Sequence, residues 1–291
     1  MARFSPGEAR SLHAIWFEDP SLSLISFKAS LDLIFKIKNK GFASKFMKNV
    51  FESNGKFAFL STLILLSFSG CASVPKIEAD RAVTSQIKRI AVLDIQEPAR
   101  ISVVNIGGAP MAFGMIGGLI QGSINAENSK EFAAAVKEEN ISFAKPLQQS
   151  VMKALEEDGF VMTDATGQKP KLAADGKSDD YSDVVVNADA MLSLWFGEVG
   201  YMSSTYSSHY QPWVVVKARL MDAKTKKDIY FKTFAVGYEI KLKNAELLPA
   251  DPKMRFSSFV ELKSKKEEAI KDLLLCEEIA VKQIQTDLKF P

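Results

Sequence analysis

One stretch, Met47 to Cys71, restricts what the chain can fold into more than any other. It reads MKNVFESNGKFAFLSTLILLSFSGC: a basic start, an almost uninterrupted apolar run, and two small residues before a cysteine. The apolar run, Phe57 to Phe68, is about a dozen residues long, whereas a membrane-spanning helix needs roughly 20. A basic flank, a short apolar core and small residues before a cut site are typical of a segment removed during export. The first 70 residues are therefore left out of the predicted fold.

The end of this stretch, Phe68-Ser69-Gly70-Cys71, resembles the lipobox of bacterial lipoproteins, although Phe68 stands where most lipoboxes carry Leu. The resemblance implies cleavage after Gly70 and covalent acyl chains, such as palmitate, on Cys71; no other cofactor is expected. Stable anchoring takes about two lipid signals, and a multiply acylated cysteine supplies them. Ala72 follows instead of the Asp that retains enteric lipoproteins at the inner membrane. The resemblance thus implies an outer-membrane anchor with the domain facing the periplasm.

Two other interpretations of the stretch stay open, an ordinary secretory signal and an apolar core helix that ends in cysteine. About 46 residues precede Met47, and we interpret them as an extension from a start codon assigned too far upstream. An amphipathic cytoplasmic segment is the alternative. The expected organisation is an upstream extension at 1–46, a signal peptide at 47–70, an acylated cysteine and tether at 71–86, and a periplasmic domain at 87–291.

The charge balance of the mature part argues against nucleic acid as a partner. The first 70 residues hold nine of the 37 basic and five of the 35 acidic side chains, which leaves 28 basic and 30 acidic ones. Binding to a phosphate backbone depends on concentrated Lys and Arg, and the mature part is close to neutral. Cys71 and Cys276 are the only cysteines. Since Cys71 is expected to be acylated, Cys276 is predicted to be a buried thiol rather than half of a disulfide.

The patterning of residues 87–291 predicts a single compact α/β (α+β) domain, with a mixed sheet, a long antiparallel hairpin and packed helices. Trp213 to Met221 alternates cleanly, with Val214, Val216, Ala218 and Leu220 on one face. Gly159 follows an apolar-striped segment where a C′ glycine belongs. The expected strands are 87–95, 101–106, 160–163, 184–199, 213–221 and 229–238, and the expected helices are 128–139, 144–158 and 256–288.

A glycine-rich segment, Gly107 to Ser123, fits none of these elements. Gly114, Gly118 and Gly122 stand four apart, so on a helix they would share one face and let another backbone approach closely. The segment is too short to span a membrane alone. Two interpretations stay open: a membrane-apposed or oligomerising helix, and a short helix or ordered loop packed on its own sheet.

The second candidate contact region is YMSSTYSSHYQP, which contains Tyr201, Tyr206, His209 and Tyr210. These side chains are amphipathic and can form hydrogen bonds, and side chains of this kind are enriched at interfaces. The alternative is a hairpin connection with incidental tyrosines. His209 is also the one histidine after residue 70, and there is no G-x-S-x-G nucleophile motif. An enzyme is therefore not expected. No metal site is expected either, because the Asp179–Asp183 cluster lacks EF-hand spacing.

The segments KRIAVLDI, PLQQSVMKALEEDGF, NADAMLSLWF and WVVVKARLMDAKTKKDIYF follow one another in an order similar to that of a group of Gram-negative lipoproteins. The group includes the curli-secretion channel lipoprotein, a penicillin-binding-protein activator and the amino-terminal domain of TolB. Its usual hairpin turn is D-A-x-T-G, whereas this chain has Lys226 at the glycine position. The resemblance implies a non-enzymatic envelope lipoprotein that binds an envelope partner or a second copy of itself. The alternative is a component of a transport or secretion system, as an oligomeric channel or an ABC-type lipid-transport auxiliary.

Overall fold

The computed structural model describes residues 76–107, 114–174, 178–204, 209–239 and 243–289. Internal contacts divide the chain into two units, Met1–Ala72 and Ser73–Pro291, and all described residues belong to the second. Gly70, Cys71 and Tyr206 lie outside the described residues, so the anchor and one candidate contact residue stay predictions.

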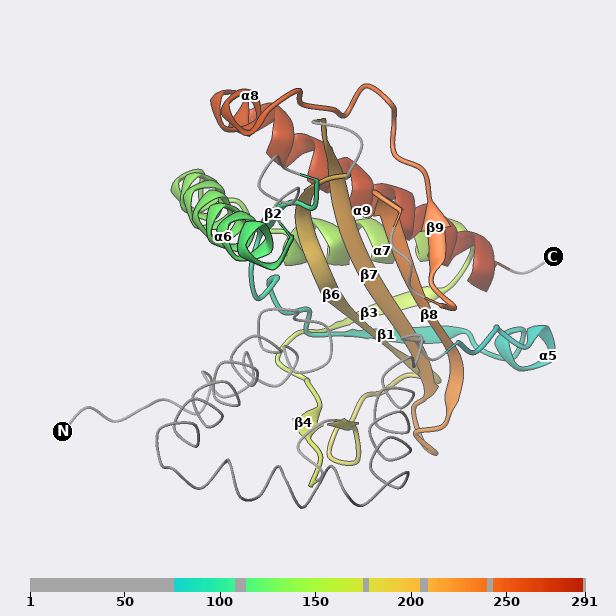
Figure 1. Ribbon diagram of the computed structural model, residues 1–291. Helices are drawn as coiled ribbons and strands as arrows, with labels where there is room; N and C mark the ends of the chain where they lie inside the picture. The colour runs from blue at the N-terminus through green and yellow to red at the C-terminus, as the bar shows by residue number, and fades with distance from the viewer. Residues whose placement is uncertain (1–75, 108–113, 175–177, 205–208, 240–242, 290–291) are drawn as a thin grey trace, which may run out of the picture. The chain divides into compact units, whose positions relative to one another are not determined.

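In the described residues, a short helix and two strands are followed by two helices, then by seven strands, and finally by two more helices (Figure 1). The helices are α5 (Arg81–Thr84), α6 (Gly114–Glu138), α7 (Ala144–Glu157), α8 (Phe259–Ser264) and α9 (Lys266–Leu288). The strands are β1 (Arg89–Leu93), β2 (Ser102–Asn105), β3 (Val161–Ala165), β4 (Lys171–Leu172), β5 (Asp179–Asp180), β6 (Ala190–Ser203), β7 (Tyr210–Asp222), β8 (Asp228–Gly237) and β9 (Glu246–Leu248).

Seven of the described strands form one mixed sheet, in the order β3-β1-β6-β7-β8-β9, with β2 also paired to β6. β1 pairs in parallel with the start of β6, at Ala190 to Leu192, and β2 pairs in parallel with its end, at Gly200 to Ser203. β6, β7 and β8 are antiparallel neighbours and make the predicted long hairpin. The predicted fold class, a mixed sheet with a long hairpin packed by helices, is confirmed.

The core lies between this sheet and the helices α7 and α9 (Figure 1). The predicted inward face of β7 is confirmed, because Val214, Val216, Ala218 and Leu220 are all buried. Burying a Val or Leu side chain contributes about 1.5–3 kcal/mol, so this alternation fixes which face of the sheet meets the helices. Cys276 on α9 is also fully buried, as predicted.

Several expected boundaries were wrong. The glycine-rich segment and the helix expected from residue 128 form one continuous helix, α6. The expected C-terminal helix is two helices, because Lys265 leaves helical geometry between α8 and α9. The strand expected from residue 184 begins at Ala190, since residues 184–189 have irregular, bent backbone before it. The two strands flanking the tyrosine-rich region also reach further than expected, to Ser203 and from Tyr210.

Gly200 allows β2 and β6 to pair. Its φ is +151°, and a Cβ built there would lie 1.9 Å from the carbonyl oxygen of Ser102. Any other residue would push the two backbones apart, so glycine is required at this position. Among the residues described, none of the helices has the length and apolar character needed to cross a membrane.

Candidate interaction surface

Helix α6 is fixed to the sheet by side chains that hydrogen-bond to the backbone of β2. Asn125 accepts from the Asn105 N–H at 3.0 Å and donates to the Asn105 carbonyl at 3.1 Å. One turn later, Ser129 accepts from the Val103 N–H at 2.8 Å and donates to the Val103 carbonyl at 3.2 Å. Side chains four apart share a helix face, so these two satisfy backbone groups that would otherwise form an open sheet edge.

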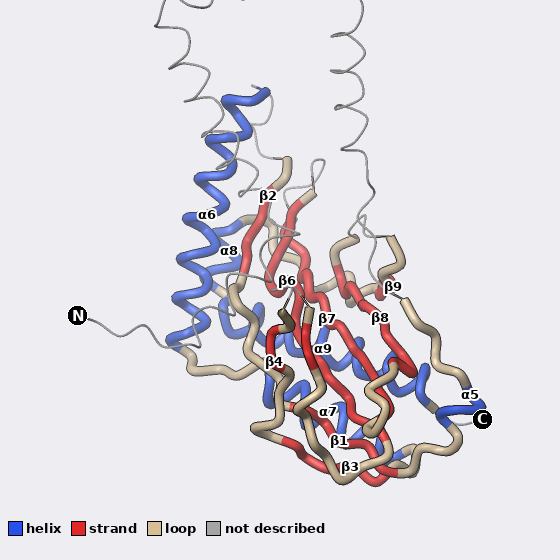
Figure 2. The backbone as a smooth tube through the Cα atoms, turned by 90° about the horizontal axis from the view of Figure 1, so that it is seen from below, coloured by secondary structure: helices blue, strands red, loops and turns tan. Residues whose placement is uncertain are grey.

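This register leaves the first part of α6 projecting beyond the strand. Asn125 lies opposite Asn105, the last residue of β2, and eleven helical residues precede it. At 1.5 Å per residue they extend about 16 Å past the end of β2. Figure 2 shows α6 running alongside β2 and continuing past it. We call residues 114–124 the α6 projection.

The α6 projection exposes apolar side chains and carries no charge. Leu119 is 50% exposed, Ile120 49% and Ile124 39%. The sequence holds no Asp, Glu, Lys or Arg from residue 107 to residue 126. Gln121 is buried and donates to Asn125 at 3.0 Å, which fixes the inner face of the helix. The outer face is thus an exposed apolar surface on a helix held by polar contacts.

The predicted glycine face lies in open space rather than against the sheet. A Cβ built at Gly118 or Gly122 would meet no heavy atom of the described chain within 4 Å. Gly114 is the first residue of α6. The interpretation of this segment as a short helix packed tightly on its own sheet was therefore wrong for Gly118 and Gly122.

The second candidate region was wrongly assigned in part. Tyr201 is fully buried, and its hydroxyl donates to the Ala269 carbonyl at 2.9 Å. Its ring makes edge contacts with Phe132 and Phe256 at centroid distances of 5.9 and 5.4 Å. Burial raises the pKa of Tyr201 far above its usual value. Tyr201 is a core residue that joins the sheet to α6 and α9, because β6 runs further than the sequence pattern indicated.

Tyr210 is 5% exposed, and its backbone pairs with Phe256 through hydrogen bonds of 2.7 and 3.0 Å. Burial is the main reason why the pKa of Tyr210 is raised. His209 is exposed. Of the four residues singled out here, His209 alone is both described and at the surface.

Three titratable groups on α9 have pKa values that burial raises strongly. Glu277 is 2% exposed, and no group of the described residues bonds to either carboxylate oxygen. Burial, together with Glu97 and Glu278, raises the pKa of Glu277 to about 9. Burial raises the pKa of the Cys276 thiol to about 12, so the reactive thiolate is scarce at neutral pH. Burial also raises the pKa of Asp272, to about 6.

Sequence reasoning missed a buried lysine on β8. Lys232 Nζ lies 2.8 Å from Asp287, 3.0 Å from Glu78 and 3.1 Å from Glu246, and the side chain is 7% exposed. Burial alone would lower the pKa of Lys232, but hydrogen bonds to the three carboxylates raise it well above its usual value. The sequence did carry a signal for this burial, because Tyr230, Lys232 and Phe234 are two residues apart and so lie on the same, inward face of the strand.

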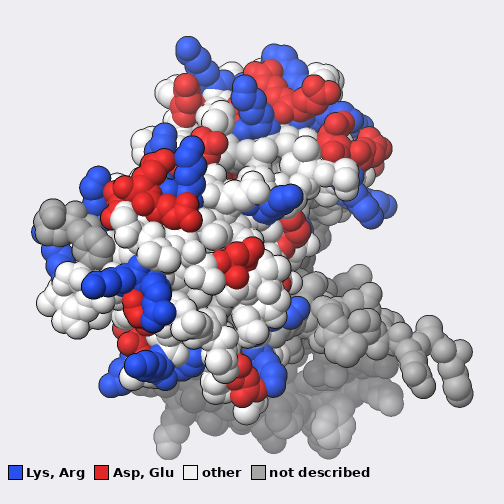
Figure 3. Space-filling model, turned by 180° about the vertical axis from the view of Figure 1, so that it is seen from behind, with Lys and Arg blue, Asp and Glu red and all other residues white. Residues whose placement is uncertain are grey.

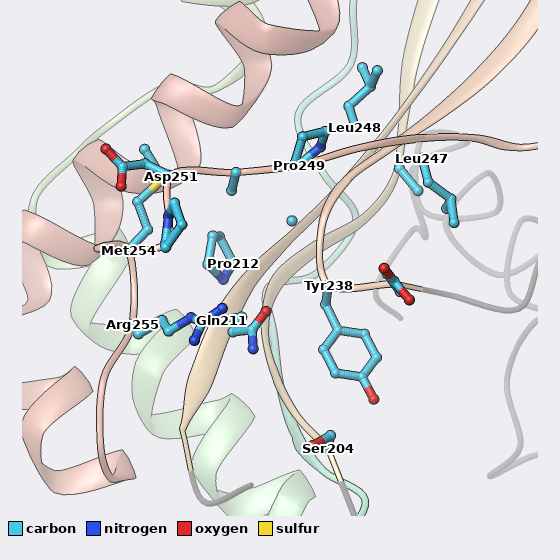
Figure 4. A pocket seen from close by; sticks show the side chains of 15 residues that line it. Ser204, Gln211, Pro212, Tyr238, Leu247, Leu248, Pro249, Asp251, Met254 and Arg255 are labelled. Carbon is cyan, nitrogen blue, oxygen red and sulfur yellow. The ribbon is translucent and has the colours of Figure 1, made fainter.

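A pocket of about 640 Å³ opens beside the start of β7 and the end of β8 (Figure 4). Its walls come from the segment 247–255 and from Gln211, Pro212 and Tyr238. In the close-up, the Arg255 side chain points toward Gln211 (Figure 4). The lining residues include no histidine or cysteine, so the described lining does not form a Ser–His or Cys–His pair.

Charged side chains do not gather into a single-sign surface on the face in view. Figure 3 shows basic and acidic side chains interspersed over the back of the domain. Within the described residues, no three His, Cys, Asp or Glu side chains come together in a way that could hold a metal ion. Among the described residues, the α6 projection holds three exposed large apolar side chains within six positions, Leu119, Ile120 and Ile124.

No family model and no curated protein matches the chain. Solved structures with some similarity include PelC from Paraburkholderia phytofirmans, described as a dodecamer, at 11% identity and a TM-score of 0.31, covering 75% of this chain and 96% of that one. Protein XCC0632 from Xanthomonas campestris is similar at 12% identity and a TM-score of 0.30, covering 69% and 81% of the two chains. Lipoprotein GNA1162 from Neisseria meningitidis is similar at 13% identity and a TM-score of 0.22, covering 51% and 81%. Likenesses this weak do not assign the chain to a family.

Proposed function

We propose that this protein is a lipid-anchored envelope lipoprotein whose folded domain binds another protein chain and carries out no chemical reaction. In this proposal Cys71 is acylated, the anchor lies in the outer membrane, and the domain faces the periplasm. The observation that supports a binding role most directly is the α6 projection, with Leu119 and Ile120 about half exposed on a rigidly held helix.

The lack of charge favours a protein over a lipid surface as the occupant of the projection. Helices that lie in a membrane interface combine an apolar face with a Lys- and Arg-rich face, and the projection has no charged side chain. Small residues at Gly118 and Gly122 leave room for a second helix to approach closely. A second copy of this chain and a different envelope protein both meet these requirements.

Disulfide trapping in cells distinguishes the two. A cysteine replacing Leu119 would be exposed, and it would be the one thiol able to react, because Cys276 is fully buried and Cys71 is acylated in the proposal. We expect Leu119→Cys to give a covalent dimer if a second copy binds, or a heavier mixed species if another cysteine-bearing protein binds. Val260→Cys is the matched control, since Val260 is 76% exposed on α8. Equal trapping at both positions, or none at residue 119, would contradict the proposed surface.

A second variant separates binding from folding. Gly118→Leu should leave the domain folded and raise its stability by roughly 0.5–1 kcal/mol, because leucine favours helix over glycine and the side chain enters open space. The same change should remove the species trapped at residue 119 by blocking close approach. Gly118→Ala is the control that gains helix propensity with little added bulk. A Gly118→Leu domain that melts earlier would show that the glycine packs inside the molecule.

A further inference from the structure

The chain just after the anchor cysteine is bound to the domain. Ile77 donates to the Phe231 carbonyl at 2.8 Å and accepts from the Phe231 N–H at 2.9 Å. This single antiparallel bridge adds Lys76–Glu78 to the free edge of β8, next to the place where β9 pairs with Phe234 to Val236. We call residues 76–78 the strap. Sequence patterning indicated a tether at residues 71–86, but the strap and α5 (Arg81–Thr84) both lie within that range.

Charge interactions hold the strap in place. Glu78 Oε2 lies 3.0 Å from Lys232 Nζ, and Glu78 Oε1 lies 2.7 Å from Lys76 Nζ. Hydrogen bonds from Lys76 and then Lys232 lower the pKa of Glu78, so it stays ionised across the neutral range. Asp287 at the end of α9 and Glu246 on β9 bind the same lysine. Lys232 thus joins the strap, an edge strand and the last turn of the C-terminal helix.

This contact shortens the reach between the anchor and the domain. Six residue steps separate Cys71 from Ile77, and an extended chain spans at most about 3.5 Å per residue. The Ile77 backbone therefore lies within about 21 Å of the Cys71 backbone, whatever path the intervening residues take. Without the strap, the first fixed point would be β1, which begins at Arg89, and the maximum reach would be about three times as long.

The surface around the strap suits a lipid headgroup layer. Ile77 is 36% exposed and Val83 on α5 is 42% exposed. Lys76, Arg81 and Lys88 are exposed basic side chains in the same stretch, which also holds the exposed acidic side chains of Glu78 and Asp80. Exposed apolar side chains beside cations can contact both the acyl boundary and anionic headgroups.

We propose that the strap holds the β8 edge of the sheet, with α5 and the nearby 222–227 turn, against the lipid bilayer that receives the acyl chains of Cys71. This inference rests on the proposed lipid anchor. It assigns a membrane-facing edge to the domain. It also predicts that the strap restricts the movement of the domain relative to the anchor, which an unbound tether would not do.

Quenching of a fluorophore by headgroup-labelled lipids tests the orientation. The acylated full-length protein is placed in vesicles that contain nitroxide headgroup lipids, with one surface cysteine at Lys224→Cys or Lys253→Cys. Both lysines are exposed. Lys224 lies in the turn after β7, and Lys253 lies in the segment that pairs with the start of β7 through Phe256. Because β7 has 13 residues, the two sites are about 40 Å apart along the sheet. We expect several-fold stronger quenching at residue 224.

Releasing the strap should remove this difference. Glu78→Lys places a cation against Lys232, and Ile77→Pro removes the N–H that donates to Phe231; each should bring the two quenching values to within about twofold of each other. Glu156→Lys makes the same charge change at an exposed site on α7 and should preserve the wild-type difference. Equal quenching in the wild type, or an unchanged difference in both strap variants, would overturn the proposal.

Failure of the anchor gives a different result from failure of the strap. A protein that does not float with vesicles and carries no acyl chain would contradict the proposed function and, with it, the membrane-facing edge. Amide exchange then still reports on the strap, because the Phe231 and Ile77 amides should be protected in the wild type and exchange at least tenfold faster in Glu78→Lys. A floating protein whose Ile77 amide exchanges freely would contradict the strap alone.

Discussion

At the scale of single residues, two buried ionisable side chains differ in their partners and in their charge. Lys232 is surrounded by three carboxylates, whereas no described group bonds to Glu277. A buried ion needs partners to offset its lost hydration. Glu277 avoids the charge by staying protonated, since burial raises its pKa to about 9. The groups that face it, Glu97 on the loop after β1 and Glu278 on α9, are also acidic.

Glu277→Gln is expected to stabilise the domain more strongly as pH rises. A carboxyl whose pKa is raised in the folded state contributes stability below its unfolded pKa near 4.5 and loses it as pH rises toward 9. Glutamine removes that loss, so the gain in the free energy of unfolding should be on the order of 1–3 kcal/mol at pH 8 and smaller at pH 5. Urea denaturation at both pH values measures it.

The matched control for this prediction is Glu278→Gln, which changes the exposed neighbour on the same helix. It should alter the free energy of unfolding by less than about 0.5 kcal/mol. A Glu277→Gln domain that is less stable than the wild type at pH 8 would show that the carboxylate is charged and has a partner.

Single residues were the hardest features to predict from the sequence. The thiol of Cys276 could be placed because the helical stripe around it is strong, and its burial is confirmed. Tyr201 was misplaced because β6 runs past an irregular register between Phe196 and Val199, which periodicity alone does not reveal. Ile77 could not be foreseen, since one bridging residue leaves no pattern in a polar stretch.

At the scale of elements, the sequence predicted strands and helices with strong periodicity and missed those with weak signals. α7 and β7 were found near their true positions, because their apolar residues repeat at 3.6 and 2. α6 was split, because Gly, Ser and Asn in its middle favour turns over helix. The start of α8 had a readable signal in Ser258 and Glu261, where the Ser258 side chain accepts from the Glu261 N–H.

The β7–β8 turn offers an element-scale test. Asp222 accepts hydrogen bonds from the Lys224 and Thr225 N–H groups, and Lys226 has a φ of +59°. A side chain at such a φ costs roughly 1 kcal/mol relative to glycine. Lys226→Gly should therefore be about 1 kcal/mol more stable than Lys226→Ala by thermal or urea denaturation.

Alanine is the proper reference because both changes remove the hydrogen bond from Lys226 Nζ to the Val184 carbonyl. Their difference isolates the backbone conformation. Equal stability of the two variants would mean that the turn relaxes out of the left-handed region when the lysine is removed.

At the scale of the whole domain, the strap and the α6 projection lie at different ends of the sheet. Across the sheet, Phe231 aligns with Arg219 and then Ser193. β2 ends opposite Ser203, ten residues further along β6, or about 33 Å. The projection continues beyond that point. A domain held by its strap would thus carry its apolar helix away from the place of attachment.

The layered arrangement followed from the sequence, because a mixed sheet with a long hairpin and flanking helices needs only the order of periodic segments. The attachment of the tether and the projection of α6 did not. Both depend on hydrogen bonds between segments far apart in the chain, such as Asn125 with Asn105 and Ile77 with Phe231.

The central claim, a lipid anchor at Cys71, is tested most directly by the intact mass of the protein extracted from the membrane fraction. We expect a chain that begins at Cys71 and carries a diacylglyceryl group on sulfur and an acyl group on the new amino terminus. Cys71→Ser should abolish that species and move the protein out of the acylated fraction. A soluble, unmodified chain that keeps residues 1–70 would contradict the account.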